Sequence, residues 1–161
     1  REYHNAQRHK RNALLPATKI EVEQRLAALI ASFMLEAMPY AWKKEAVFVP
    51  IPTRQSAKRT RGFDHLSLIA KQLEQQSNIP VIPALSVKTK KDQRLLDARE
   101  RLQNMESSFS ICPDAQGLLQ HCQKIILVDD VMTTGATLFA AANTLRSMVS
   151  IPIYGLTFSR A

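Results

Sequence analysis

The 161-residue sequence has few cysteines, few aromatic residues and no long apolar run, and each shortage excludes a class of protein. Its two cysteines, Cys112 and Cys122, form no C-x-x-C pair, so neither a disulfide scaffold nor a cysteine zinc site is supported. No apolar run approaches the roughly 18–20 residues that cross a bilayer. The first residues, REYHNAQRHKRN, lack the apolar stretch of a secretory signal. We therefore expect a cytoplasmic protein.

Positive charge is in excess and is concentrated in three segments. The formal net charge is +8, and the segments 1–11, 53–61 and 86–104 carry net charges of +3, +4 and +3, which leaves the remainder slightly acidic. Such segments are either solvated loops or a surface for an anionic partner, such as phosphate, nucleic acid or a membrane. The aromatic content of 6% argues against an extensive base-stacking groove.

Three stretches have helical patterns. Residues 18–38 open with Thr18 and Glu21 in capping-box spacing. One face of this helix carries Val22, Leu26, Leu29, Ile30 and Phe33. A second helix is predicted over 63–77, with its inward face formed by Leu66, Ile69, Ala70 and Leu73. The third helix is predicted over residues 135–149.

Short apolar runs between these helices predict buried strands. They cover residues 46–51, 79–85, 107–112, 124–130 and 151–159. Apolar strands that alternate with helices indicate an α/β fold, in which a mostly parallel open sheet is covered by helices on both faces.

Two adjacent carboxylates, Asp129 and Asp130, end the predicted strand 124–130. Open parallel sheets bind ligands at the carboxyl ends of their strands. Adjacent side chains on a strand point to opposite faces, and both reach solvent in the turn that follows. Their oxygens suit vicinal sugar hydroxyls or a hydrated Mg²⁺. The pair therefore indicates a ligand that carries hydroxyl groups or a cation.

The turn after the acid pair, TTGAT, offers donors instead of acceptors. Backbone N–H groups at a helix N-terminus, with the hydroxyls of Thr133, Thr134 and Thr137, form a cradle for phosphate, and Gly135 permits close approach. The alternative is that Asp130 only ends a strand and a threonine only caps a helix. An acid pair and a phosphate cradle within nine residues predict a ribose 5-phosphate ligand.

These residues resemble a known family. The stretch ILVDDVMTTGAT at 126–137 resembles the phosphoribosyl-pyrophosphate motif of type I phosphoribosyltransferases. The stretch VPIPTRQSAKRTRGFD at 49–64 resembles the V-P-x-P and R-G-F-N-Q elements of the competence-associated ComF branch. The spacing of that branch is also matched by Gln93, Leu96, Arg101, Asn104 and Phe109. The resemblance to the ComF family covers about residues 47–159.

The sequence departs from the ComF pattern in three ways. Asp64 and His65 stand where Asn and Gln are usual, and Lys90 stands where Thr is common. The cysteine-rich zinc module of that branch has no counterpart, as expected of a fragment.

The resemblance implies a type I phosphoribosyltransferase-like fold with a mobile hood at 86–104. Residues 1–45 would form a basic, helical N-terminal segment and 46–161 the phosphoribosyltransferase-like domain. Asp129 and Asp130 would bind the ribose hydroxyls and, through water, Mg²⁺. The 5-phosphate would be held by Thr133, Thr134, Gly135, Ala136 and Thr137.

Five further residues take their roles from the resemblance alone. Thr53 and Arg54 occupy the pyrophosphate-loop position, and three hood residues, Gln93, Arg101 and Asn104, would close on the ligand. No catalytic residue is indicated.

The family implies service in DNA uptake during natural competence. Its implied ligand is phosphoribosyl pyrophosphate or a nucleotide, and its implied partners are single-stranded DNA and competence proteins at the inner face of the membrane. Two functions stay open. One is a Mg²⁺-dependent phosphoribosyltransferase, which transfers a pentosyl group as pyrophosphate leaves. The other is a catalytically inactive accessory that binds single-stranded DNA.

Overall fold

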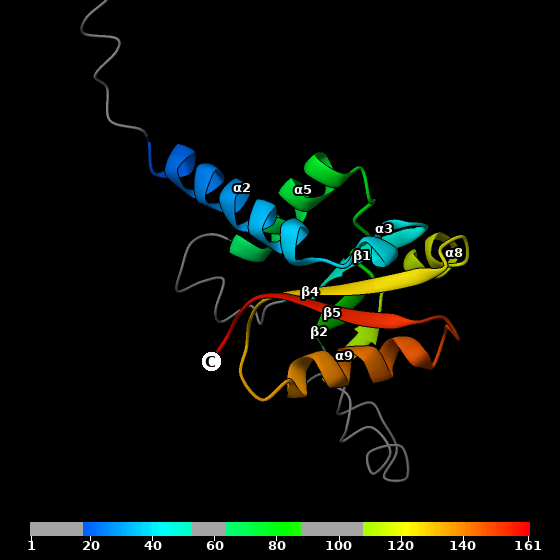
Figure 1. The fold of residues 1–161 in the computed structure, drawn as a ribbon. Coiled ribbons are helices and arrows are strands. Elements are labelled where there is room, and N and C mark those ends of the chain that lie inside the picture. The colour runs from blue at the N-terminus through cyan, green and yellow to red at the C-terminus, as the bar shows by residue number, and fades with distance from the viewer. Residues whose placement is uncertain (1–17, 53–63, 88–107) are drawn as a thin grey trace, which may run out of the picture.

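Parallel strands form the centre of the molecule. The computed structural model describes residues 18–52, 64–87 and 108–161 (Figure 1). Within these ranges, a three-stranded sheet has the order β1-β4-β5. Its strands are parallel and comprise Ala46–Pro50 (β1), Lys124–Met132 (β4) and Ile153–Arg160 (β5). The predicted α/β fold with a mostly parallel sheet is therefore confirmed.

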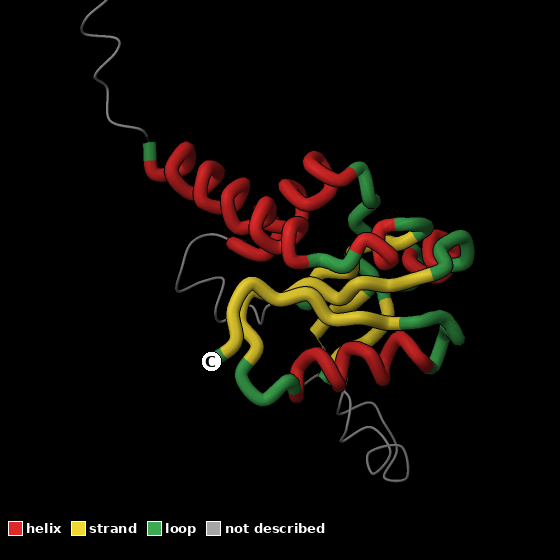
Figure 2. Tube along the Cα trace, viewed as in Figure 1, coloured by secondary structure: helices red, strands yellow, loops and turns green. Residues whose placement is uncertain are grey.

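Helices cover both faces of this sheet, as the alternating pattern predicts. Helices α2 (Lys19–Ala37) and α5 (His65–Ser77) lie on one face, and α9 (Ala136–Arg146) lies on the other (Figures 1 and 2). The strands between them are apolar on both sides, and four successive β4 residues are fully buried: Ile125, Ile126, Leu127 and Val128. In the part of the chain that the structure describes, no helix is long and apolar enough to cross a membrane.

Helix α5 buries the face that its sequence predicts. Its four predicted inward residues, Leu66, Ile69, Ala70 and Leu73, are all buried. Asp64, one of the departures from the ComF pattern, is the N-cap, and its Oδ1 accepts from the Ser67 N–H at 3.3 Å. Asn78 ends the helix in the left-handed conformation, with φ 58°. Capping and periodicity agree here, so the predicted helix is correct to within two residues at its start.

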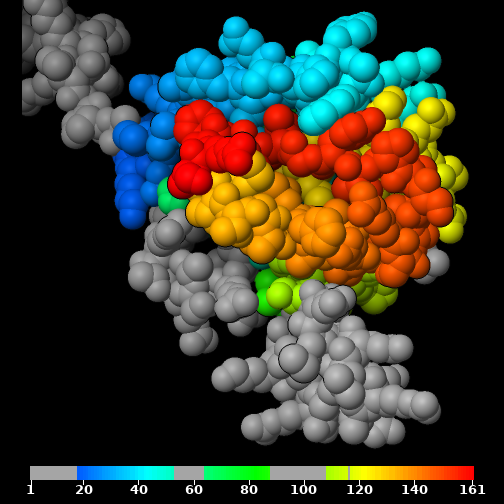
Figure 3. Space-filling model, turned by 60° about the horizontal axis from the view of Figure 1, so that its bottom comes forward, coloured from blue at the N-terminus to red at the C-terminus, as the bar shows by residue number. Residues whose placement is uncertain are grey.

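Helix α2 has the predicted capping box but buries a different face. The Thr18 hydroxyl accepts from the Glu21 N–H, and the Glu21 carboxylate accepts from the Thr18 N–H. Its buried residues are Ala27, Ala31 and Met34. The larger apolar side chains point away from the sheet, with exposed fractions of 53% for Val22, 50% for Leu26, 53% for Leu29 and 52% for Phe33. Small residues on the buried face let α2 approach α5 and β5 closely. Figure 3 shows α2 and β5 side by side on the surface, with α9 beyond them.

The predicted strand at 79–85 is mostly wrong. Within this range, Val81 forms a single bridge to Phe48 at the outer edge of β1, and Leu85 is the first residue of a separate strand. Pro80 and Pro83 lack the N–H that a longer ladder needs. The strand that does form is β2 (Leu85–Val87), which pairs antiparallel with β3 (Phe109–Ile111).

Two short helices complete the described ranges, and the sequence analysis did not anticipate either. They are α3 (Tyr40–Lys43), before β1, and α8 (Ala115–Leu119), before β4. Trp42 of α3 stacks on Tyr154 of β5 with ring centroids 4.3 Å apart. This pair anchors α3 against the edge strand.

Candidate ligand site at the end of β4

Strand β4 carries the acid pair past the end of its neighbour β1. The β1–β4 pairing stops at Pro50 and Val128, whereas the β4–β5 pairing continues to Met132 and Arg160. Asp129 and Asp130 are thus the first β4 residues beyond β1, although the strand runs two residues further than predicted. The end of β1 leaves open space beside them.

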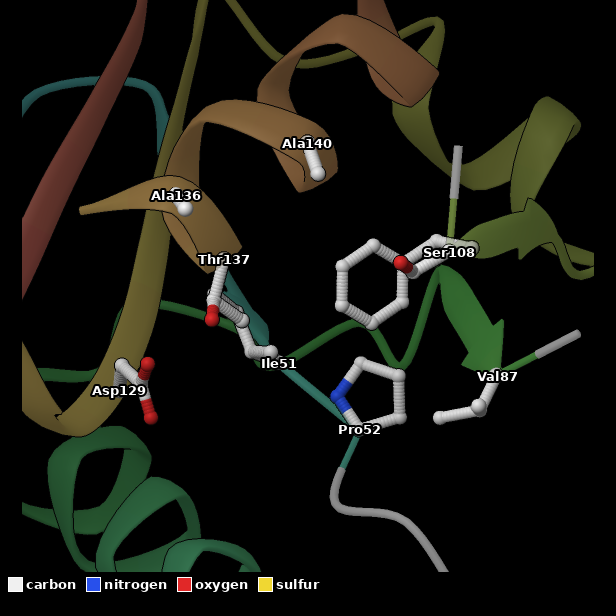
Figure 4. A pocket seen from close by; sticks show the side chains of 9 residues that line it. Ile51, Pro52, Val87, Ser108, Asp129, Ala136, Thr137 and Ala140 are labelled. Atoms are coloured by element: carbon white, nitrogen blue, oxygen red, sulfur yellow. The ribbon is translucent and has the colours of Figure 1, made fainter. Parts of the chain in front are cut away.

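That space is a pocket of about 380 Å³. Its lining residues come from five parts of the chain and are Ile51, Pro52, Val87, Ser108, Phe109, Asp129, Ala136, Thr137 and Ala140. Figure 4 shows the Asp129 carboxylate on the β4 side, below the first turn of α9, where Thr137 points down from the helix. Asp130 does not line the pocket, because neighbouring side chains on a strand alternate in direction.

Backbone hydrogen bonds hold the acid pair in place. Asp129 Oδ1 accepts from the Asp130 N–H at 2.9 Å, and Asp130 Oδ1 accepts from the Val131 N–H at 2.8 Å. Burial raises the pKa of Asp129 to about 6, the Asp130 N–H opposes that rise, and the negative charge of Asp130 adds to it. A cation at this carboxylate would favour its ionised form.

The cradle at the start of α9 is partly assembled. Gly135 is the N-cap and has φ 77°, a left-handed conformation that favours glycine. The Ala136 N–H donates to the Thr134 hydroxyl at 3.3 Å. Of the predicted phosphate-binding residues, Ala136 and Thr137 line the pocket; Thr133, Thr134 and Gly135 do not.

Apolar residues complete the lining of the pocket, and most of them were not among the residues that the sequence indicated as candidates. Ile51, Val87 and Ala140 carry no chemical signal in the sequence, while Phe109 matched the ComF spacing without a role. Pro52 gave a signal only as part of the V-P-x-P element. One face of the pocket is therefore apolar and the other carries a carboxylate and a hydroxyl.

Five predicted residues lie outside the described residues. Thr53 and Arg54 follow the pocket residue Pro52 directly in sequence, and Gln93, Arg101 and Asn104 fall between the pocket residues Val87 and Ser108. Their predicted roles stay predictions.

The donor set fits Mg²⁺. Across residues 18–52, 64–87 and 108–161, no group of three or more His, Cys, Asp or Glu side chains is placed to hold a metal ion. Protein sites for Mg²⁺ commonly supply one or two carboxylates and leave the other positions to water and ligand phosphates. Asp129 in the pocket, with Asp130 next to it in sequence, supplies the one or two carboxylates of such a site, whereas a site for Ca²⁺ would need more protein oxygens.

The raised pKa of Asp129 predicts that removal of its charge stabilises the folded protein. The folded pKa of Asp129, about 6, exceeds the ordinary aspartate value of 3.8. The folded state therefore binds more protons between these values, and stability is lost as pH rises through about 6. Asp129→Asn should therefore raise the free energy of unfolding at pH 7.5 by about 1 kcal/mol, after allowance for solvent at this half-buried group, and by little at pH 4.

Urea unfolding at both pH values measures this effect. Asp114→Asn, at an exposed carboxylate without a capping hydrogen bond, is the matched control and should change neither value. Equal stability of Asp129→Asn and the unmutated chain at pH 7.5 would contradict the assigned environment.

Comparison with known proteins adds the family. No protein-family model matches the chain. Competence protein F of Haemophilus influenzae is 29% identical over 140 residues, which is 84% of this chain and 60% of that protein. Competence protein ComFC of Bacillus subtilis is 36% identical over 102 residues, which is 63% of this chain and 39% of that protein. The chain spans less than two thirds of the length of these curated relatives. These two competence-protein relatives support a ComF family assignment for the chain.

Proposed function

We propose that the chain binds phosphoribosyl pyrophosphate, or a related ribose 5-phosphate ligand, together with Mg²⁺ in the pocket between β4 and α9. The observation that supports this proposal is that Asp129 and Thr137 line one pocket from opposite sides of the same strand–turn–helix. The carboxylate accepts from ribose hydroxyls. The first turn of α9 supplies N–H and hydroxyl donors to the phosphate.

Mg²⁺ would lie beside the acid pair. Asp129 and Asp130 would hold it, directly or through water, and it would neutralise charge on the pyrophosphate. The protein's own contribution is the placement of the Asp129 carboxylate and one donor-rich helix end around a small volume. The apolar wall excludes water from one side of the ligand.

The biological setting that we propose is DNA uptake in natural competence. Both curated relatives are named as competence proteins, and these homologues support a competence-related function. Because the chain covers only part of each relative, the activity of the whole protein and its competence-protein partners are part of the same proposal.

Titration calorimetry tests the ligand. With phosphoribosyl pyrophosphate and Mg²⁺ we expect saturable binding to one site, which chelation of Mg²⁺ weakens. Ribose 5-phosphate should bind more weakly, because it lacks the pyrophosphate that shares the ion. Release of pyrophosphate in the presence of a nucleophile would distinguish pentosyl transfer from binding alone. Absence of binding with Mg²⁺ present would overturn the proposal.

Single-stranded DNA is the second candidate ligand, and the observation in its favour is the clustered positive charge of the sequence. The net charge is +8, and the positive excess lies entirely in three segments, because the remainder of the chain is slightly acidic. If these segments contact backbone phosphates, log affinity should fall by about 0.7 per contact for each unit of log salt concentration. Fluorescence anisotropy with a labelled oligonucleotide at several salt concentrations measures the slope. A flat dependence would show that the basic segments are not the binding surface.

A further inference from the structure

Helix α2 presents an apolar stripe that nothing in the described part of the chain covers. The stripe comprises Val22, Leu26, Leu29 and Phe33, each at least 50% exposed. On the other side of the helix, Ala27, Ala31 and Met34 supply the packing against the fold. The helix is thus apolar on two sides, and its larger side chains are on the side that faces away.

The spacing of the stripe is compatible with a helical partner. Its members recur at intervals of four, three and four residues. This is the alternation of a coiled-coil seam, in which side chains of one helix insert between those of another. Any apolar face of a helix has this spacing, so the choice of partner depends on the charges at its ends.

Charges at the two ends of the stripe indicate that the partner is α2 of a second copy, in antiparallel orientation. The same spacing continues to Lys19 before Val22 and to Glu36 after Phe33. In an antiparallel pair of α2 helices, Leu26 lies opposite Leu29 and Val22 opposite Phe33. Lys19 then lies opposite Glu36 of the partner subunit at both ends. A parallel pair would oppose like charges instead.

The composition of α2 also favours self-association over an anionic partner. The helix carries two basic and three acidic residues, whereas the whole chain has a net charge of +8. Two copies can therefore meet here without the repulsion that the basic segments would cause.

The N-terminal residues of the chain are a poor occupant of the stripe. Their apolar run is ALLPA at 13–17, joined directly to Thr18. Leu14 is four residues from Thr18 and reaches about 14 Å when fully extended. Phe33 is 15 residues along the helix, or about 22 Å. The run falls short of the end of the stripe.

We propose that α2 is a dimerisation helix, which pairs antiparallel with α2 of a second copy through Val22, Leu26, Leu29 and Phe33. One helix per copy forms a smaller interface than the roughly 1,200–2,000 Å² of standard ones, so we expect a weak, concentration-dependent dimer. The proposal does not depend on the ligand of the β4–α9 pocket.

Sedimentation equilibrium of the 161-residue chain, from about 1 to 200 µM, tests it. We expect a monomer–dimer equilibrium whose dissociation constant rises about 100-fold in Leu29→Glu, because each dimer loses two buried leucines. Leu118→Glu, at a 56% exposed leucine on α8, is the matched control and should leave the equilibrium unchanged. A monomer at every concentration would overturn the proposal, and so would a dimer that Leu29→Glu does not weaken.

Charge reversal tests the orientation. Lys19→Glu and Glu36→Lys should each weaken the dimer, and the double substitution should restore it, since opposite charges again face each other. Both substitutions suit the helix dipole, but Lys19→Glu also removes the 3.9 Å ion pair between Lys19 and Glu23, so circular dichroism of each variant distinguishes a weaker dimer from a lost helix. Failure of the double substitution to restore the dimer would overturn the antiparallel arrangement.

Discussion

Asp129→Asn combined with Asp130→Asn should lower the affinity for phosphoribosyl pyrophosphate in the presence of Mg²⁺ by about 100-fold or more. Hydrogen bonds to charged groups contribute about 1.5–3 kcal/mol each, and the double substitution removes the charge from two acceptors. The loss should be specific to Mg²⁺-dependent binding. Asparagine keeps an oxygen for the backbone N–H groups that now bond to the carboxylates.

Calorimetry with the folded variant provides the measurement, and circular dichroism confirms the fold. The single variants separate the two residues. Because Asp129 lines the pocket and Asp130 does not, Asp129→Asn should cause the larger loss. Asp114→Asn, which lies outside the 126–137 motif, is the control. Unchanged affinity in the folded double variant would refute the assignment of the site.

Phe48→Ala should produce the largest loss of stability. Phe48 is fully buried at the centre of β1, between the two helical layers. Removal of a buried Phe typically costs about 3–5 kcal/mol, through lost burial and the cavity left behind. A loss of this size is a large fraction of the roughly 5–15 kcal/mol that holds a domain folded.

Phe139→Ala is the matched control for this substitution. Phe139 lies on α9 with 65% of its surface exposed, so its removal should change stability by less than about 0.5 kcal/mol. Denaturant midpoints of the two variants measure the difference. Similar midpoints would mean that β1 is not at the centre of the core.

Residue patterns predicted α5 and the three strands of the parallel sheet well, because the apolar residues of each leave one interpretation, whereas most of the predicted strand at 79–85 did not form. Strand β4 is a continuous apolar run, which is typical of a strand buried on both faces. Helix α5 has one apolar face and buries it. Helix α2 has two, and periodicity cannot tell which one meets the sheet. The choice depends on how closely the helix approaches, and that is a property of the packed structure.

The polar half of the pocket could be predicted from the sequence, and the apolar half could not. Asp129 and Thr137 stand out because a carboxylate at a strand end and a hydroxyl at the following helix start lie where open parallel sheets bind ligands. Ile51, Val87 and Phe109 look like ordinary core residues. Only the fold shows that β1 and β2 end, and β3 begins, beside the same space.

The separation of Asp129 from Asp130 depends on the length of β4. The sequence analysis placed the pair at the end of the strand, where both side chains can turn to one ligand. Because β4 continues to Met132, the alternation of the strand persists through the pair and directs only Asp129 into the pocket.

Amide chemical shifts of the isotope-labelled 18.1 kDa chain, recorded during titration with phosphoribosyl pyrophosphate and Mg²⁺, show whether the ligand binds in the pocket between β4 and α9. If it does, we expect saturable shifts at Asp129, Ala136 and Thr137, and none at Leu118 on α8. We also expect these shifts to disappear in Asp129→Asn. Saturable binding that leaves the β4–α9 turn unperturbed, or no perturbation at any ligand concentration, would contradict binding in this pocket.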